Sequence, residues 1–286
     1  MSLSGLVLRI QGEMDELNPT ERRIGEYFIS FPHALLRMPI ADVASEIGTS
    51  QAAIVRFCKR LGFAGYKDIK SKIADELLAA AEPREDESYS DIKPHDSLNT
   101  IVAKIASNNV LSIEETLKLL DMNAFEKAVD LLSEANRVDV FGIGASGLVA
   151  QDMQQKLTRI GRFSYAFGDV HTQLTAAASL TEKDVMYLIS YSGRTRDVLD
   201  CLTAAKNCGA KVIAVTKVGT NPLAKKADVV LQVCSSEISI RSSATSSRIT
   251  QLTVNDMLFT CIASRCYDTN QEILKRSRAY NAKRKL

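Results

Sequence analysis

The sequence predicts two domains, an all-α helix-turn-helix domain followed by an α/β domain with a doubly wound parallel sheet. Three observations predict this fold class. Apolar residues in the first 80 positions recur at helical spacing, an acidic segment with prolines follows, and short apolar runs then alternate with amphipathic stretches. The 286 residues suffice for two separate cores. We expect the boundaries to fall at 1–80, 81–97 and 98–286.

The first helices are predicted by periodicity and by capping residues. Apolar side chains between Leu3 and Leu17 fall on one helical face. Asn18 precedes Glu21 at capping-box spacing, and Pro19 suits the first position of a second helix. The chain therefore turns sharply near residue 18.

A helix-turn-helix unit is predicted next. Two short amphipathic stretches, 40–47 and 51–61, are separated by Gly48, which permits a tight turn, and by Ser50, which can cap the second helix. Such a second helix is free to enter a DNA major groove. Residues 49–73 carry six basic side chains and one acid, a local charge of +5. We therefore expect double-stranded DNA as a partner, contacted by Ser50, Gln51, Ala52, Val55, Arg56, Lys59 and Arg60.

The segment contains Ala41-Asp-Val-Ala44, Gly48-Thr-Ser50 and the run 55–66 with its Gly-Phe-Ala-Gly-Tyr end. In these residues it resembles the N-terminal domain of RpiR-type bacterial transcription regulators. It implies a regulator that binds operator DNA.

The segment 81–97 is predicted to be a solvated acidic linker. Between residues 82 and 96 acids outnumber bases six to two, and Pro83 and Pro94 interrupt any helix.

The six cysteines of the chain include no Cys-x-x-Cys pair, which argues against a zinc site and fits a reducing compartment. No apolar run reaches the roughly 18 residues of a membrane helix. We expect a cytoplasmic protein with no metal, no cofactor and no membrane contact.

The second domain is predicted to hold a parallel sheet. Helices are expected at 98–120 and at 123–132, the latter opened by Asn123 and Glu126, with a last helix at 245–262. Strands are expected at 138–141, 164–167, 185–190, 211–216 and 229–233. Ligands of such sheets bind outside the carboxyl ends of the strands, near the point where the strand order reverses.

Two loops at those ends carry the chemistry. The glycine loop, residues 142–147, has G-x-G-x-x-G spacing, and the serine loop, residues 190–195, places hydroxyls and a glycine before a helix. Hydroxyls and backbone N–H groups at a helix N-terminus favour a phosphate. Asp169 lies where a ribose-binding acid would sit, so an NAD(H)-sensing repressor is an alternative. Because both loops converge on one point, they favour a phosphorylated ligand that is smaller than a dinucleotide.

Residues 141–146 and 189–195 resemble the two signature loops of the SIS, or sugar isomerase, domain. The resemblance implies that Ser146, Ser190, Ser192 and Thr195 bind the phosphate and nearby hydroxyls of a phosphosugar effector. Gly193 is added because the tight turn of the serine loop needs it. Gly144 is added because it belongs to the glycine loop, as Ser146 does. Two further candidates line the expected cleft with less specific signals, namely His171 and Glu237.

Together, the resemblances predict a transcription regulator, most simply a repressor, and not an enzyme. Its operator affinity would be controlled by a phosphorylated sugar, and it would act as a homodimer or homotetramer. A sugar-phosphate isomerase with a helical accessory domain is the other alternative, since His171 and Glu237 form a plausible acid–base pair. The identity of the sugar, the controlled genes and the sign of the response stay open.

Overall fold

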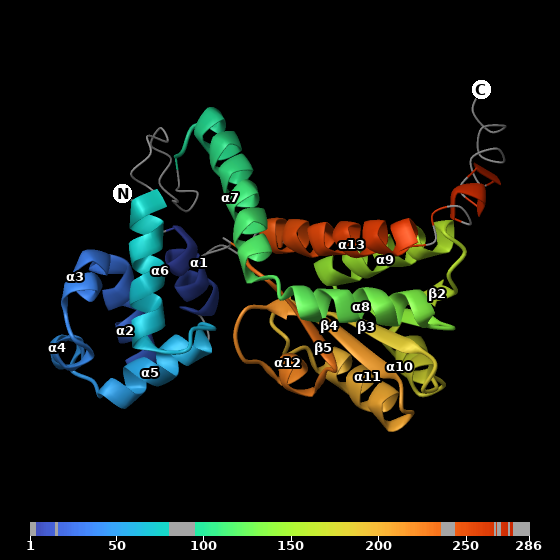
Figure 1. Cartoon of the computed structure of the whole chain (residues 1–286), viewed down its shortest axis with the longest axis horizontal. Coiled ribbons are helices and arrows are strands. Elements are labelled where there is room, and N and C mark those ends of the chain that lie inside the picture. Colours follow the sequence, from blue (N-terminus) through green and yellow to red (C-terminus); the bar gives the residue numbers. More distant parts are fainter. Residues whose placement is uncertain are drawn as a thin grey trace. The chain divides into compact units, whose positions relative to one another are not determined.

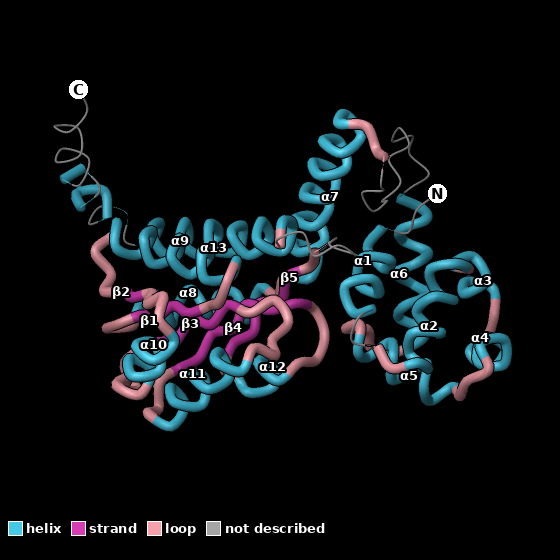
Figure 2. Tube along the Cα trace, turned by 180° about the vertical axis from the view of Figure 1, so that it is seen from behind, coloured by secondary structure: helices cyan, strands magenta, loops and turns pink. Residues whose placement is uncertain are grey.

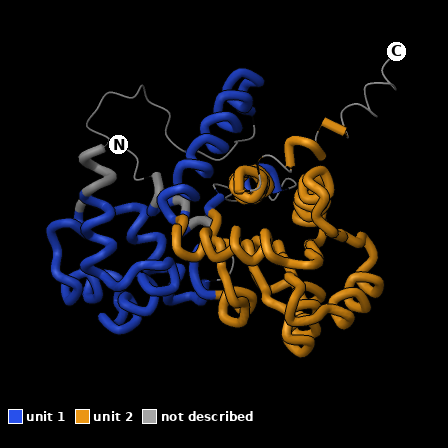
Figure 3. The backbone as a smooth tube through the Cα atoms, turned by 45° about the vertical axis from the view of Figure 1, so that its right-hand side comes forward, with its two compact units in different colours: residues 1–119, 218–220, 234–247 blue, residues 120–217, 221–233, 248–286 orange. Residues whose placement is uncertain are grey.

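The computed structural model describes residues 4–14, 17–79, 95–235, 244–265, 267, 270–273 and 275–276. Contacts divide the chain into two compact units, coloured separately in Figure 3. The first unit comprises residues 1–119, 218–220 and 234–247, and the second comprises 120–217, 221–233 and 248–286. Among the described residues, no helix combines the length and the apolar character needed to cross a membrane.

The first unit is helical. Its helices are α1 (Ser4–Glu13), α2 (Pro19–Ser30), α3 (Pro32–Arg37), α4 (Ile40–Ile47), α5 (Gln51–Arg60), α6 (Tyr66–Ala79) and α7 (Leu98–Leu119). Helices α1 to α6 enclose one apolar core, in which Phe28 and Phe57 meet edge to face at 5.8 Å between ring centroids. The capping box predicted at Asn18 is confirmed, because the Asn18 side chain accepts from Glu21 N and the Glu21 carboxylate accepts from Asn18 N.

The predicted helix-turn-helix is confirmed in α4 and α5. Gly48 ends α4 in the left-handed region, at φ 70°, which glycine adopts without steric cost. Two residues later, the Ser50 hydroxyl accepts a hydrogen bond from Ala53 N and so caps α5. Val43, Ala44 and Ile54 are buried where the two helices meet the core.

The second unit contains a five-stranded parallel sheet of order β2-β1-β3-β4-β5. Its strands are β1 (Val138–Phe141), β2 (Ser164–Tyr165), β3 (Val185–Ile189), β4 (Lys211–Lys217) and β5 (Val229–Val233). Its helices are α8 (Met122–Glu134), α9 (Ala145–Arg159), α10 (Val170–Ala177), α11 (Arg196–Asn207), α12 (Pro222–Lys226) and, from Arg248 onward, α13 (Thr245–Arg265). All five expected strands are present, although the second is two residues shorter than predicted.

Helices cover both faces of this sheet, as Figures 1 and 2 show. Apolar side chains of α8, α9 and α13 pack on one face, and those of α10, α11 and α12 pack on the other. The central strand β3 is buried along its whole length. The predicted doubly wound α/β class is therefore confirmed.

One predicted detail of this unit is wrong. The N-cap of α8 is Asp121, whose carboxylate accepts from Asn123 N and Ala124 N. Asn123, predicted to open the helix with Glu126, instead lies inside its first turn. The acidic side chain of Asp121 competes well for this position because it also complements the helix dipole.

Candidate functional site

The outer face of α5 carries polar and basic side chains in the positions that a recognition helix needs. Its inner face is fixed by Ile54, Phe57 and Cys58, all buried. Burial raises the pKa of the Cys58 thiol to about 12, so this cysteine is a packing residue and not a nucleophile. The predicted DNA-contacting residues that are exposed to solvent are Ser50, Gln51, Ala52, Arg56 and Lys59.

Two of the predicted DNA-contacting residues, Val55 and Arg60, are not fully exposed. Val55 is half-buried. Arg60 turns toward the helical core, where its Nε lies 3.0 Å from Glu13 and its Nη1 lies 3.2 Å from Glu21. Two carboxylates already neutralise this guanidinium, so we leave Arg60 out of the proposed DNA contacts.

The glycine loop and the serine loop begin side by side in the second unit. β1 and β3 pair in parallel, with Phe141 opposite Leu188, and the strand order reverses at this pair. A Cβ at Gly142 would lie 2.9 Å from Ile189 O and 2.6 Å from Ser146 O. The two loops thus leave neighbouring strand ends for opposite faces of the sheet, which is the usual ligand position in this fold.

The serine loop gathers hydroxyl groups. Ser190 Oγ and Thr195 Oγ1 are hydrogen-bonded at 3.1 Å, and Ser192 Oγ accepts from Arg194 N at 3.2 Å. Thr195 is the N-cap of α11, yet its side chain makes no capping bond. Its hydroxyl is therefore directed to Ser190 rather than to the helix, and the loop presents hydroxyls beside a helix N-terminus.

Gly193 fixes the shape of this loop. Its φ of +63° lies in the left-handed region, and a Cβ there would come within 1.9 Å of Asn221 Oδ1. Asn221 is buried, donates to Thr216 Oγ1 and accepts from Ala224 N. Asn221 was not predicted, because it comes 28 positions after Gly193 and supports the loop only through the fold.

The glycine loop leads into α9. Gly144, at φ 61° and ψ −126°, is the N-cap and supplies no side-chain bond. Ser146 lies in the first turn, where its Oγ donates to Gln251 Oε1 of α13 at 3.3 Å. The structure therefore brings Ser190 and Thr195 into contact, while it pairs Ser146 with a residue that the sequence did not indicate.

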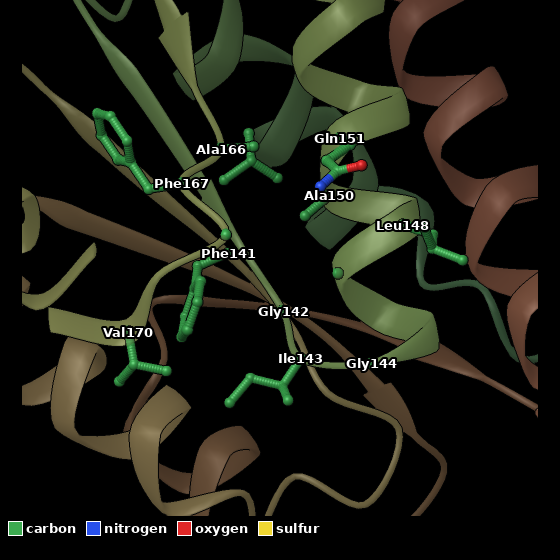
Figure 4. Close-up of a pocket in the computed structure, with 13 residues that line it drawn as sticks. Phe141, Gly142, Ile143, Gly144, Leu148, Ala150, Gln151, Ala166, Phe167 and Val170 are labelled. Carbon is green, nitrogen blue, oxygen red and sulfur yellow. The ribbon is translucent and has the colours of Figure 1, made fainter. Parts of the chain in front are cut away.

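A pocket of about 210 Å³ opens beside the glycine loop, between α9 and the residues that follow β2 (Figure 4). Its walls are mainly apolar side chains and glycine backbone, with one side-chain amide from Gln151. The lining residues are Val140, Phe141, Gly142, Ile143, Gly144, Gly147, Leu148, Ala150, Gln151, Ala166, Phe167, Gly168 and Val170. The hydroxyls of Ser146, Ser190, Ser192 and Thr195 do not line this pocket.

The remaining candidates are placed as follows. His171 is exposed in the first turn of α10, next to the pocket residue Val170. Glu237 lies outside the described residues. Asp169 caps α10 by accepting from Thr172 N and Oγ1, both at 2.8 Å, and these bonds lower the pKa of its carboxyl group. This capping role leaves Asp169 a poor ribose ligand and weighs against the dinucleotide alternative.

No group of three or more histidine, cysteine, aspartate or glutamate residues suited to a metal ion occurs within the described ranges. The two loops and their partners supply hydroxyls, side-chain amides and backbone N–H groups. Such groups bind phosphates and sugar hydroxyls.

Comparison with known proteins identifies the families to which the two parts of the chain are similar. The family model "Helix-turn-helix domain, rpiR family" matches residues 4–80, and the "SIS domain" model matches residues 131–261. An HTH-type transcriptional regulator of Bacillus subtilis (strain 168), YbbH, is 36% identical over 280 residues, covering 98% of this chain and 97% of its own. A bifunctional protein glk of Paraburkholderia xenovorans is 37% identical over 266 residues, which are 92% of this chain but 41% of that protein.

Solved structures show the same architecture. The Vibrio vulnificus NanR protein complexed with ManNAc-6P matches with a TM-score of 0.60 at 23% identity, covering 96% of this chain and 97% of that one. The sugar isomerase domain of an RpiR transcription factor from Sphaerobacter thermophilus matches with a TM-score of 0.57 at 25% identity, covering 63% and 98%. With a helix-turn-helix, a SIS fold and a relative similar over nearly its full length, the chain belongs to the RpiR family of helix-turn-helix transcription regulators.

Proposed function

We propose that this regulator binds operator DNA through α5 and that a phosphorylated sugar bound at the glycine and serine loops controls its operator affinity. The observation that carries the proposal is the meeting of these two loops at the reversal point of a SIS sheet. The hydroxyls of Ser190, Ser192 and Thr195 would hold the phosphate, and Ser146 would complete the site from α9.

The DNA contacts follow from the exposed face of α5. Arg56 and Gln51 would donate hydrogen bonds to base edges, while Lys59 would neutralise a phosphate. Two copies of the chain, or two pairs of copies, would present their α5 helices to DNA half-sites. These half-sites would be separated by about one turn of the DNA helix or by a multiple of one turn. The domain boundaries at 81 and 98 stay predictions, as does the solvated linker.

The site is proposed to bind its ligand without turnover. An isomerase needs a general base within reach of the substrate, and the candidate acid–base pair was His171 with Glu237. His171 is exposed in the first turn of α10, and Glu237 lies outside the described residues. Two relatives that match over more than nine-tenths of their own length are named as transcriptional regulators.

One experiment tests ligand and site together. The full chain is heated with a panel of sugar phosphates, including ManNAc-6P, and with NAD and NADH as the competing class. We expect one sugar phosphate to raise the unfolding midpoint, and Ser192→Ala to abolish this rise while operator binding persists. A normal response of Ser192→Ala, or stabilisation by NADH alone, would overturn the assignment.

A further inference from the structure

The side chain of Gln251 has an unused hydrogen-bond donor in a buried position. Gln251 lies on α13 and is 1% exposed. Its Oε1 accepts from Ser146 Oγ at 3.3 Å, whereas its Nε2 has no hydrogen-bond partner. A buried donor without an acceptor is unfavourable, and native proteins keep few of them. This donor therefore needs an explanation.

The location of Gln251 explains the unpartnered donor. The carboxamide of Gln251 faces the first turn of α9, a helix of 15 residues whose N-cap, Gly144, has no side chain to satisfy the leading N–H groups. These N–H groups and the helix dipole favour an anion. Yet Ser146 donates its single hydroxyl proton to Gln251, so it has no proton left to donate to an anion.

We propose that Gln251 is a positioning residue that switches the direction of the Ser146 hydroxyl when a phosphosugar binds. The last side-chain torsion of glutamine is soft, and a half-turn about it exchanges Oε1 and Nε2. After this exchange, Nε2 donates to Ser146 Oγ, and the Ser146 proton is donated to an oxygen of the ligand. No covalent bond changes. This inference rests on the proposed function, because it requires a phosphosugar at the glycine loop.

The helix that carries Gln251 is well fixed, so a side-chain rotation is the available response. One turn further along α13, Asn255 accepts from Tyr187 OH at 2.9 Å and donates to Val149 O at 2.9 Å. Tyr187 is buried in the central strand, and Val149 belongs to α9. These bonds hold α13 to both β3 and α9, so the proposal places the change in the Gln251 side chain and not in the helix.

The test uses inorganic phosphate, the group that every sugar phosphate shares, titrated into the full chain and into Gln251→Met. Methionine fills a similar volume and removes the unpartnered donor, so the unfolding midpoint without phosphate should not fall. Phosphate affinity should fall about threefold or more, because nothing then directs the Ser146 hydroxyl toward the anion. Unchanged affinity would overturn the inference.

A double-mutant cycle separates positioning from a merely structural effect. In a Ser146→Ala background, Gln251→Met should cause no further loss of phosphate affinity, because Gln251 acts through the missing hydroxyl. An equal loss in both backgrounds would overturn the inference. Ser133→Ala is the control, since Ser133 Oγ on α8 is also buried without a partner, and it should leave phosphate affinity unchanged.

The failure of this inference is distinguishable from the failure of the proposed function. If neither phosphate nor any sugar phosphate stabilises the wild-type chain, both are overturned. If the wild type is stabilised and Ser192→Ala abolishes the effect, but Gln251→Met behaves as the wild type, only the role of Gln251 is overturned.

Discussion

Single residues decide whether the serine loop can form at all. The loop turns at Gly193, where the backbone is left-handed and the space for a side chain is already occupied by Asn221 and Thr216. Those two side chains are hydrogen-bonded to each other, and Thr216 Oγ1 also donates to Tyr191 O within the loop. The hydroxyls of the loop are therefore positioned by a buried polar network.

Gly193→Ala should be strongly destabilising. The new Cβ would lie 1.9 Å from Asn221 Oδ1 and 2.8 Å from Thr216 Oγ1, on a backbone at φ +63°. We expect a loss of about 3 kcal/mol in the free energy of unfolding, measured by urea denaturation. Gly168→Ala in the same unit is the control, because a Cβ there meets nothing within 4 Å. Equal losses for the two variants would contradict this account of the loop.

The sequence indicated individual residues well where the signal was local. The Ser50 cap, the left-handed Gly48 and the Asn18 capping box depend on neighbours within four positions, and all are present. Partners distant in sequence were not predictable. Arg60 pairs with Glu13 across 47 positions, and Ser146 bonds to Gln251 across 105, so only the folded chain reveals that these side chains meet.

At the scale of elements, α5 combines two demands at its N-terminus. Ser50 must satisfy the first N–H groups of the helix, and the same end would face DNA phosphates. A neutral hydroxyl meets both demands, since it accepts from Ala53 N without adding negative charge. A carboxylate would meet only the first.

Two substitutions at Ser50 should therefore separate stability from DNA binding. Ser50→Ala removes the cap and should cost about 1 kcal/mol of unfolding free energy. Ser50→Asp retains a capping acceptor and should keep the stability, but its charge should weaken operator binding. Denaturation and fluorescence anisotropy with operator DNA measure the two effects. Wild-type DNA affinity in Ser50→Asp would show that this helix end does not face DNA.

Strands were predictable where a short run is mainly apolar. The strands β1, β3 and β5 match the expected ranges almost residue for residue, because apolar residues dominate each of these short runs. The edge strand β2 pairs with β1 over only two positions, so its apolar continuation through Phe167 reads as strand in sequence but forms the pocket wall instead. The length of β2 is set by its pairing with β1, and the sequence does not show this pairing.

At the scale of the whole molecule, the proposed function requires that the second unit influence the first. Each unit has its own apolar core. Control of DNA binding must then be expressed as a coupling free energy between two sites on one chain. Such couplings are typically about 1–3 kcal/mol, or roughly 5–150-fold in affinity.

Reciprocity gives this coupling a strict test. If a sugar phosphate changes operator affinity by some factor, saturating operator DNA must change the affinity for that sugar phosphate by the same factor. We expect equal factors in the full chain, measured by anisotropy for DNA and by calorimetry for the ligand. Ser192→Ala should bring the first factor to one by abolishing ligand binding, whereas Arg56→Ala should weaken DNA binding and leave ligand affinity intact. Factors of one in the wild type would mean that the two sites are uncoupled and that the effector acts on something other than operator affinity.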